Sequence, residues 1–278
     1  MNPRTLLADA ARRLAEAGVE SSRVDAELLL AFVLSTSRTG LLTVDDVPDD
    51  AAARFAALLD QRADRVPLQH LTGRAPFRHL ELAVGPGVFV PRPETEALVG
   101  WALERLDGLD RPVVVDLGSG SGAIALSIAH EHPGARVRAV ERDPVAIEWT
   151  RTNAAGTTVE VLAGDMTDPA LLRDLDGTVD LVVSNPPYVP DGARVPREVA
   201  DHDPPLALWG GPDGLDVVRG LLGTAERLLH PGGWLGIEHA DQQGTALPAL
   251  VRGHGGFADV EDHPDLAGRP RFTTARRC

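Results

Sequence analysis

The sequence predicts an α/β protein in which a Rossmann-like, doubly wound sheet follows a small helical bundle and a β-hairpin linker. Two observations lead to this prediction. From about residue 93 onward, short apolar runs alternate with helical patterns, which indicates a mostly parallel sheet covered by helices. Before residue 73, apolar residues follow helical spacing only. We therefore expect an N-terminal helical domain at 1–73, a hairpin linker at 74–92 and a sheet domain at 93–278.

The composition favours a soluble protein of the cytoplasm. Of the 278 residues, 43% are hydrophobic, which is enough for a substantial core. The formal net charge is −14 and every basic residue is an arginine, so direct nucleic-acid binding is not expected. The single cysteine is the last residue, and no Cys/His cluster has the spacing of a metal site. No membrane span and no signal peptide are evident in the sequence.

Three amphipathic helices are predicted in the first 73 residues, where apolar side chains recur at three- and four-residue spacing. Gly18 is expected to end the first helix. Ser21–Ser22 and Asp49–Asp50 are expected to cap the next two. No catalytic constellation lies here. By analogy with other helical modules beside catalytic domains, we expect this one to recognise a protein substrate.

The linker is predicted to be a β-hairpin. Short β-like runs between residues 77 and 90 are separated by Gly85–Gly87, which is expected to form the connection. Prolines after Val90 then stop the strand, and Glu94–Glu96 opens a helix that runs to Leu106.

Strands and helices alternate through the sheet domain. The expected strands are 113–115, 137–140, 159–162, 181–183 and 234–237, with late, antiparallel strands at 257–260 and 272–275. The expected helices are 121–130, 144–154, 170–175, 215–229 and 243–251.

A glycine-rich turn follows the first of these strands, which ends in Asp116. The turn consists of Gly118, Ser119, Gly120, Ser121 and Gly122. Glycines allow a tight turn and the close approach of a ligand, and the helix behind them offers free N–H groups. The glycines also fit a loose dinucleotide fingerprint, or a tight turn without a ligand. Asp116 is more specific, because a buried carboxylate needs a partner, which a cationic ligand group would supply.

The next two strands end in candidate nucleoside contacts. Glu141 stands where a carboxylate accepts the ribose hydroxyls of a nucleoside, and Asp165 and Met166 stand where an adenine would lie. The simpler alternatives are a solvated acid for Glu141, a helix cap for Asp165 and ordinary core for Met166.

The segment Asn185, Pro186, Pro187 and Tyr188 follows the strand at 181–183. The two prolines end strand pairing and restrict Asn185 to extended conformations. The result is a rigid loop at the carboxyl end of a strand, the edge at which open α/β sheets bind ligands. It presents carbonyl acceptors, an amide side chain and an aromatic ring, which can hold a planar NH₂ group. A structural Pro-Pro turn is the simpler alternative.

These two motifs, in this order, resemble the S-adenosylmethionine-dependent methyltransferases that act on a planar nitrogen. Further segments narrow the resemblance to the HemK-type release-factor glutamine methyltransferases: Asp25–Ala31, Pro67–Gly73, Val90–Glu96 and Gly210–Leu215. The likeness extends over nearly the whole chain. It implies transfer of a methyl group to N5 of the glutamine in the Gly-Gly-Gln loop of peptide chain release factors, with the helical domain helping to hold the factor.

The resemblance also implies roles for single residues. Gly118–Gly122 would wrap the methionine part of the cofactor, Glu141 would bind its ribose and Met166 would lie against its adenine. Asn185 would touch both cofactor and substrate amide, and Asn185–Tyr188 would form the glutamine pocket. Asn185, Pro186 and Tyr188 would be the catalytic set.

Three positions depart from the family pattern. His70 stands where tyrosine is usual, Met166 replaces an often larger side chain, and Asp201–Pro204 is a weak form of an aromatic-Glu-Pro segment. They bear on adenine packing and partner docking and leave the central motifs intact.

For the reaction, we expect the Asn185 oxygen and the Pro186 carbonyl to accept the two N–H groups of the substrate amide, with no general base. One alternative is a methyltransferase for another planar nitrogen, in a ribosomal-protein glutamine or a nucleic-acid base. A base enzyme working on a duplex must flip its target and usually carries a basic face, which the net charge of −14 opposes. An NAD-dependent oxidoreductase leaves Asp116 and the Asn-Pro-Pro-Tyr segment unexplained. A non-catalytic nucleotide-binding module that docks a ribosomal partner is the third alternative.

Overall fold

The computed structural model describes residues 1–278, which form two compact units. One unit combines Met1–Arg74 with Val195–His202, and the other combines Ala75–Arg194 with Asp203–Cys278. The sequence pattern does not indicate that a short segment near residue 200 belongs with the N-terminal helices.

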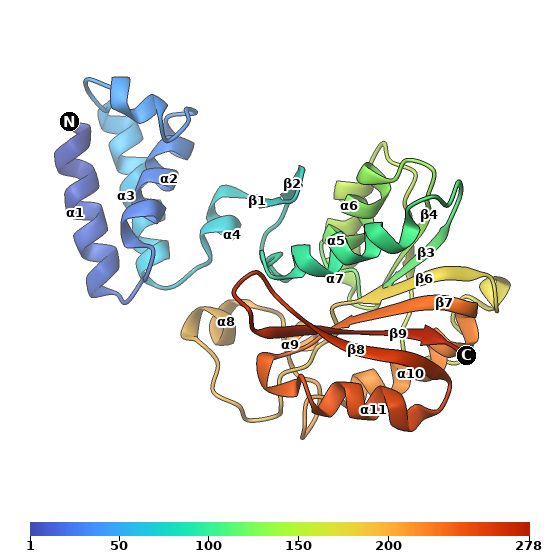
Figure 1. The fold of residues 1–278 in the computed structure, drawn as a ribbon. Coiled ribbons are helices and arrows are strands. Elements are labelled where there is room, and N and C mark those ends of the chain that lie inside the picture. The colour runs from blue at the N-terminus through green and yellow to red at the C-terminus, as the bar shows by residue number, and fades with distance from the viewer. The chain divides into compact units, whose positions relative to one another are not determined.

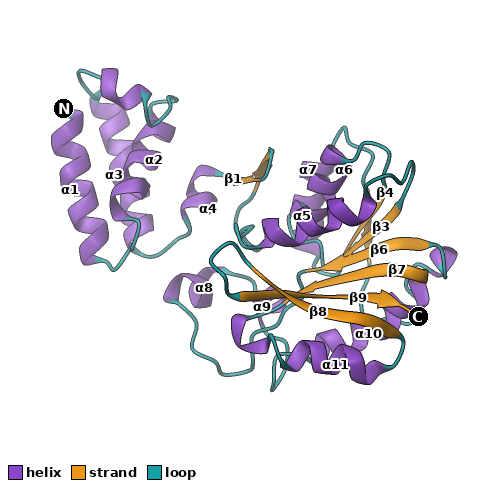
Figure 2. Cartoon of the chain, viewed as in Figure 1, coloured by secondary structure: helices purple, strands orange, loops and turns teal.

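The helical unit contains helices and loops but no sheet (Figure 2), and the apolar side chains of its helices form one buried cluster. Its elements are α1 (Pro3–Glu16), α2 (Ser22–Val33), η1 (Gly40–Thr43), α3 (Asp49–Ala63), α4 (Leu68–Thr72) and α8 (Arg197–His202). The expected caps are wrong in detail. The Ser21 hydroxyl donates to the Asp25 carboxylate at 2.7 Å and makes no cap, and Pro48 occupies the N-cap position of α3. Asn2 caps α1 by accepting from the Arg4 and Thr5 N–H groups.

A buried arginine holds α8 in this unit. Nε of Arg62 donates to Asp25 at 2.7 Å, and Nη1 donates to Glu198 of α8 at 2.8 Å. The Arg62 and Asp25 side chains are almost fully buried. Because removing one partner would leave a buried charge without compensation, these contacts are expected to tie α8 firmly to the helices.

The hairpin is present, but its turn is not at the expected glycines. Strand β1 (Arg74–Phe77) pairs with β2 (Leu80–Ala83), so Arg78 and His79 make the turn. Gly85 and Gly87 serve close packing instead. A Cβ on Gly85 would lie 2.6 Å from the Trp149 ring, and one on Gly87 would lie 2.5 Å from Val145.

The second unit contains a seven-stranded sheet with strand order β5-β4-β3-β6-β7-β9-β8. Its strands are β3 (Val113–Leu117), β4 (Arg136–Glu141), β5 (Glu160–Ala163), β6 (Val179–Ser184), β7 (Leu229–Glu238), β8 (Phe257–Pro264) and β9 (Pro270–Arg277). The first five in this order are parallel, and β9 pairs antiparallel with both β7 and β8. The predicted doubly wound fold with late antiparallel strands is confirmed.

Helices cover both faces of this sheet (Figure 1). On one face lie α5 (Thr95–Leu106), α6 (Ala123–Glu131) and α7 (Pro144–Ala154), and on the other α10 (Asp216–Leu228) and α11 (Ala246–His254). The unit also contains η2 (Arg173–Leu175), α9 (Pro205–Leu208) and η3 (Asp241–Gln243). Each face has its own buried apolar cluster. No helix of the chain is both long and apolar enough to cross a membrane.

Two expected helices differ from the structure. The helix predicted at 170–175 is only the 3-10 turn η2, preceded by Leu172 with a left-handed φ of 53°. The helix predicted to end at Leu229 stops at Leu228, because the fully buried Leu229 begins β7 and pairs with Val179.

The strand order places the candidate motifs together. β3 lies between β4 and β6, so the chain leaves it on one side and returns on the other. Ligands of open α/β sheets bind at the carboxyl ends of strands beside such a switch point. The glycine-rich turn follows β3, Glu141 is the last residue of β4 and the Asn-Pro-Pro-Tyr loop follows β6, so all three lie at the carboxyl ends of these parallel strands.

Candidate active site

The glycine-rich turn has a backbone that requires glycine. Gly118, Gly120 and Gly122 have φ values of 81°, 56° and 86°, which side-chain-bearing residues rarely adopt. The N–H groups of Gly118 and Ser119 donate to the Val140 carbonyl at 2.8 and 3.0 Å. These bonds fix the turn against the end of β4.

The turn is covered on one side and open on the other. A Cβ on Gly118 would lie 2.5 Å from Cε of Met166, whereas a Cβ on Gly120 would meet no atom within 4 Å. A ligand can therefore approach the backbone at Gly120 closely. The Thr150 hydroxyl, which donates to the Gly120 carbonyl at 2.6 Å, holds this part of the turn in place.

Asp116 is the fully buried strand-end carboxylate that the sequence indicates. Its Oδ2 accepts from the Ala125 N–H at 3.1 Å in the first turn of α6, and its Oδ1 has no protein partner. Burial is the main cause that raises the pKa of Asp116 to about 7, and nearby Glu141 adds to the shift. One oxygen thus supports the helix, while the other can accept a donor from a ligand.

Glu141 is bound by the backbone around it. Its Oε1 accepts from the Arg142 and Asp143 N–H groups at 2.7 and 2.9 Å, and its Oε2 accepts from the Gly120 N–H at 2.9 Å. A carboxylate offers about four acceptor positions, so one remains on Oε2. That position suits one hydroxyl of a ribose, whereas binding both would require giving up a backbone contact.

After β5, the structure agrees better with the simpler interpretations of Asp165 and Met166, a cap and a core residue. Asp165 accepts from the backbone N–H and the hydroxyl of Thr167 at 2.8 and 2.7 Å, as a turn cap does. Met166 is buried among core residues, and its Cε lies 2.5 Å from the position that a Cβ on Gly118 would occupy. A role for Met166 at an adenine stays a prediction.

The Asn-Pro-Pro-Tyr loop is held from several sides. Pro186 and Pro187 are buried, and Nδ2 of Asn185 donates to the Thr95 hydroxyl at 3.3 Å. The Tyr188 carbonyl accepts from Nε2 of Gln243 at 3.0 Å, and the Tyr188 hydroxyl lies 3.5 Å from Oε1 of Glu238.

Two glycines allow a second loop to lie on this one. A Cβ on Gly210 would lie 2.6 Å from the Pro187 carbonyl oxygen, and one on Gly214 would clash with the Tyr188 carbonyl. This packing gives a physical reason for the glycines in the segment Gly210–Leu215.

Sequence reasoning missed three residues around the loop: Thr95, Glu238 and Gln243. Glu238 is 1% exposed, and burial is the main cause that raises its pKa to about 7. The sequence does contain a pattern that indicates Glu238. Glu238 is the last residue of β7 and Asp116 is the last but one of β3, so the same argument about a buried carboxylate near a strand end applies to both.

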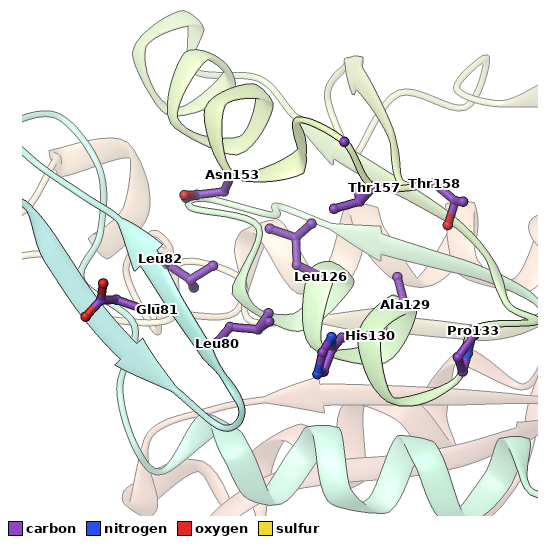
Figure 3. Close-up of a pocket in the computed structure, with 11 residues that line it drawn as sticks. Leu80, Glu81, Leu82, Leu126, Ala129, His130, Pro133, Asn153, Thr157 and Thr158 are labelled. Carbon is purple, nitrogen blue, oxygen red and sulfur yellow. The ribbon is translucent and has the colours of Figure 1, made fainter.

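A separate cavity of about 400 Å³ lies between the hairpin, α6 and the segment after α7 (Figure 3). Leu80 and Leu82 of β2 and Leu126 and His130 of α6 line it. Asn153 connects it to the site, because its side-chain amide donates to the Ser121 carbonyl at 3.0 Å. None of the predicted site residues lines this cavity.

Two family models match the chain. The PrmC N-terminal domain matches residues 5–73, and the methyltransferase small domain matches residues 84–201.

Close relatives align over nearly the whole length. A release factor glutamine methyltransferase of Streptomyces coelicolor is 53% identical over 98% of this chain and 96% of its own. Its counterpart from Mycolicibacterium smegmatis is 53% identical over 99% and 97%, and that from Mycobacterium tuberculosis H37Rv is 47% identical over 96% and 89%.

Solved structures are similar in fold at low identity. The hMettl16 catalytic domain has a TM-score of 0.56 at 16% identity, over 84% of this chain and 83% of its own. A Thermus thermophilus 16S rRNA methyltransferase in complex with AdoMet and guanosine has a TM-score of 0.53 at 22% identity, over 74% and 50%. These structures show that the chain shares their fold.

Proposed function

The chain belongs to the family of release factor glutamine methyltransferases, and on that premise we propose that it methylates N5 of the glutamine in the Gly-Gly-Gln loop of a peptide chain release factor. The methyl donor is S-adenosylmethionine, and the reaction takes place in the cytoplasm, where release factors act. Membership in this family excludes two alternative functions, that of an NAD-dependent oxidoreductase and that of a non-catalytic nucleotide-binding module. The observation that carries the proposal is the orientation of the Asn185 amide beside an open glycine turn.

The donor side of the site fits S-adenosylmethionine. The open backbone at Gly120 suits the methionine part, and the unpartnered Oδ1 of Asp116 suits a donor group of that part. Glu141 has one acceptor position left for a ribose hydroxyl, and Met166 lies beside the turn for contact with the adenine. When bound, the cofactor supplies an electrophilic methyl group on sulfur and leaves as S-adenosylhomocysteine.

The acceptor side must align a weak nucleophile, because the lone pair of a carboxamide nitrogen is delocalised into its carbonyl. The Asn185 Nδ2 group donates to Thr95, so Oδ1 lies on the opposite side of the amide and can accept a substrate N–H. The Pro186 carbonyl accepts the second N–H. These two acceptors turn the nitrogen lone pair toward the methyl group and stabilise the positive charge that develops on nitrogen.

In this scheme, the Tyr188 ring packs over the amide plane of the substrate glutamine. As the N–CH₃ bond forms, the S–CH₃ bond breaks, and one N–H proton then leaves to water. No side chain has to remove a proton before the transfer.

The helical unit is the candidate for recognising the rest of the factor. It corresponds to the segment matched by the PrmC N-terminal domain, and it contains no catalytic constellation of its own. Helix α8 follows the Asn-Pro-Pro-Tyr loop in the chain and is bound to Arg62. The catalytic loop is therefore connected by a short stretch of chain to the unit that we propose binds the factor.

Methyl transfer from labelled S-adenosylmethionine to a purified release factor tests the proposal. We expect one methyl group per factor, on the glutamine of the Gly-Gly-Gln loop, located by peptide mass mapping. A ribosomal-protein mixture and total RNA serve as competing substrates. Label on either of these, with the factor unlabelled, would point to another planar nitrogen and would overturn the proposed substrate.

A further inference from the structure

A buried glutamine contacts three separate segments at the carboxyl edge of the sheet, one of them the Asn-Pro-Pro-Tyr loop. Gln243 ends η3, which follows β7, and Ile237 of β7 pairs with Ser184, directly before that loop. The neighbouring strands therefore bring Gln243 to the loop, although 55 residues of chain separate it from Tyr188. Gln243 is only 6% exposed and has no part in the mechanism described above.

The side-chain amide of Gln243 uses both of its protons and its oxygen. Nε2 donates to the Tyr188 carbonyl at 3.0 Å and to the Asp213 carbonyl at 3.3 Å, and Oε1 accepts from the Ala240 N–H at 3.0 Å. The two carbonyls can only accept and the N–H can only donate, so the reversed amide would match none of the three. The three contacts therefore fix the orientation of the amide.

The segment around Asp213 gives this amide a firm second anchor. The Asp213 carboxylate accepts from Nη1 of Arg219 in α10 at 3.0 Å, which binds the segment to that helix. Gly214 has a left-handed φ of 76°, and a Cβ there would lie 2.7 Å from Nε2 of Gln243 and would clash with the Tyr188 carbonyl. The absence of a side chain at this position lets the amide and the loop meet.

The other end of the Asn-Pro-Pro-Tyr loop is held by a different contact, in which Nδ2 of Asn185 donates to the Thr95 hydroxyl. Between the two ends, the ring of Pro187 fixes its own φ and also restricts Pro186. Few free rotations therefore separate the Pro186 carbonyl from the Tyr188 carbonyl. A displacement of the Tyr188 carbonyl would move the Pro186 carbonyl, the proposed acceptor for the second substrate N–H.

We propose that Gln243 is a positioning residue for methyl transfer, which holds the Tyr188 carbonyl against the Asp213 segment and thereby fixes the Pro186 carbonyl and the Tyr188 ring around the substrate amide. Gln243 touches neither the substrate nor the cofactor in this scheme. The inference rests on the proposed function, because the pocket that it concerns is the one for the substrate glutamine.

Single-turnover transfer at saturating cofactor and release factor tests this role. Gln243→Met keeps the length of the side chain but has no donor, and Gln243→Glu keeps an acceptor for the Ala240 N–H but places a second oxygen against the two carbonyls. We expect each variant to lower the transfer rate by about 10-fold or more, because a displaced acceptor misaligns the nucleophile. The affinity for S-adenosylhomocysteine should change less than about 3-fold, which also shows that the variants are folded.

The preceding residue offers matched controls. Gln242 lies in the same short helix η3 but is exposed. Gln242→Met and Gln242→Glu make the same chemical changes one position away and should transfer at the wild-type rate. Wild-type rates in both Gln243 variants would overturn the positioning role. A loss of S-adenosylhomocysteine affinity as large as the loss of rate would also overturn it, because Gln243 would then support the fold as a whole.

A measurement on the chain without substrate tests the contact itself. Tyr188 is the only tyrosine of the chain, so labelling with tyrosine that carries ¹³C in its carbonyl group gives a single tyrosine carbonyl signal, from the group that accepts from Gln243. This NMR signal should shift in both Gln243 variants and stay at its wild-type position in both Gln242 variants. An unchanged signal in the Gln243 variants would refute the inference. Absence of transfer to a release factor by the wild-type chain, with the signal shifted as expected in the variants, would instead refute the proposed function.

Discussion

Glu141 supports the glycine turn as well as any ligand. Its carboxylate binds three backbone N–H groups, one of them at Gly120, and keeps one acceptor position for a hydroxyl. A substitution at this residue therefore changes both the turn and the ligand contact.

We expect Glu141→Ala to weaken S-adenosylhomocysteine binding by roughly 1–3 kcal/mol, the scale for hydrogen bonds to a charged group. Calorimetric titration measures this change. Glu141→Gln, which keeps one oxygen acceptor, should lose less. Equal affinity of wild type and Glu141→Ala would rule out the ribose contact.

Asn185 is the residue on which the proposed chemistry depends most directly. Asn185→Ala removes the side-chain acceptor but keeps the backbone set by Pro186. We expect the transfer rate to fall by about 10²-fold or more, the scale for one oriented polar group in a transition state, while cofactor affinity falls much less. Single-turnover transfer and a separate binding titration measure the two effects. A transfer rate of Asn185→Ala close to that of wild type would show that the Asn-Pro-Pro-Tyr loop is only a structural turn.

The raised pKa of Asp116 makes the stability of the chain depend on pH. Between its ordinary pKa near 4 and about 7, folded Asp116 keeps a proton that the unfolded chain releases. Raising the pH through this window therefore lowers the free energy of unfolding.

Asp116→Asn removes this titration and keeps an oxygen for the Ala125 N–H. The free energy of unfolding of wild type minus that of Asp116→Asn should fall by up to about 1.4 kcal/mol per pH unit between pH 4.5 and 6.5. Urea unfolding of both chains across this range gives the difference. A difference that stays constant or grows with pH would contradict the raised pKa.

The turn between β3 and α6 shows how an element can be shaped for a ligand. Its three left-handed glycines differ in their surroundings, since Gly118 faces Met166 and Gly120 faces open space. The covered position serves the fold, and the open position suits the close approach of a ligand.

Gly120→Ala tests this distinction. The left-handed backbone should cost about 1–2 kcal/mol of stability, but the added methyl group should also project into the cofactor space and weaken S-adenosylhomocysteine binding by 10-fold or more, about 1.4 kcal/mol. Gly177→Ala is a matched control, because Gly177 has a φ of 64° and a Cβ added there would meet no atom within 4 Å. It should lose similar stability and bind normally. Equal binding by both variants would mean that the open face is not the cofactor site.

At the scale of the whole molecule, the helical unit is proposed to act in recognition and the sheet unit in chemistry. The helical unit contains both the N-terminal helices and α8, which are held together by the partly buried contact between Arg62 and Glu198. A truncation that removes only the first segment therefore also leaves Glu198 without its partner.

Removal of residues 1–73 should spare cofactor binding and strongly reduce transfer to an intact release factor. A short Gly-Gly-Gln peptide should lose much less, because it cannot use contacts remote from the reacting nitrogen. The truncated chain should also carry Glu198→Gln, so that no unpaired charge remains. The ratio of the two transfer rates is the measurement. Equal losses on both substrates would show that the helical unit supports folding only.

The local sequence was sufficient for the features that depend on neighbouring residues. The β-branched run at Val113–Val115, the glycines after it and the prolines after Asn185 each restrict their own backbone, so strands, turn and loop were predictable. Prediction failed where a distant contact decides. Leu229 lies in β7, paired with Val179, and not in the predicted helix. The hairpin turn lies at Arg78–His79, and Gly85 packs against Trp149.

The sequence by itself therefore determined the fold class and the two motifs, because short-range sterics and hydrophobic periodicity specify them. Only the tertiary structure brought Thr95 to Asn185 and Glu238 to Tyr188, across 90 and 50 residues of chain. It alone placed α8 with Arg62, 136 residues away. Contacts of this kind leave no periodic trace in the sequence, since each depends on how separate strands and helices meet once the core is packed.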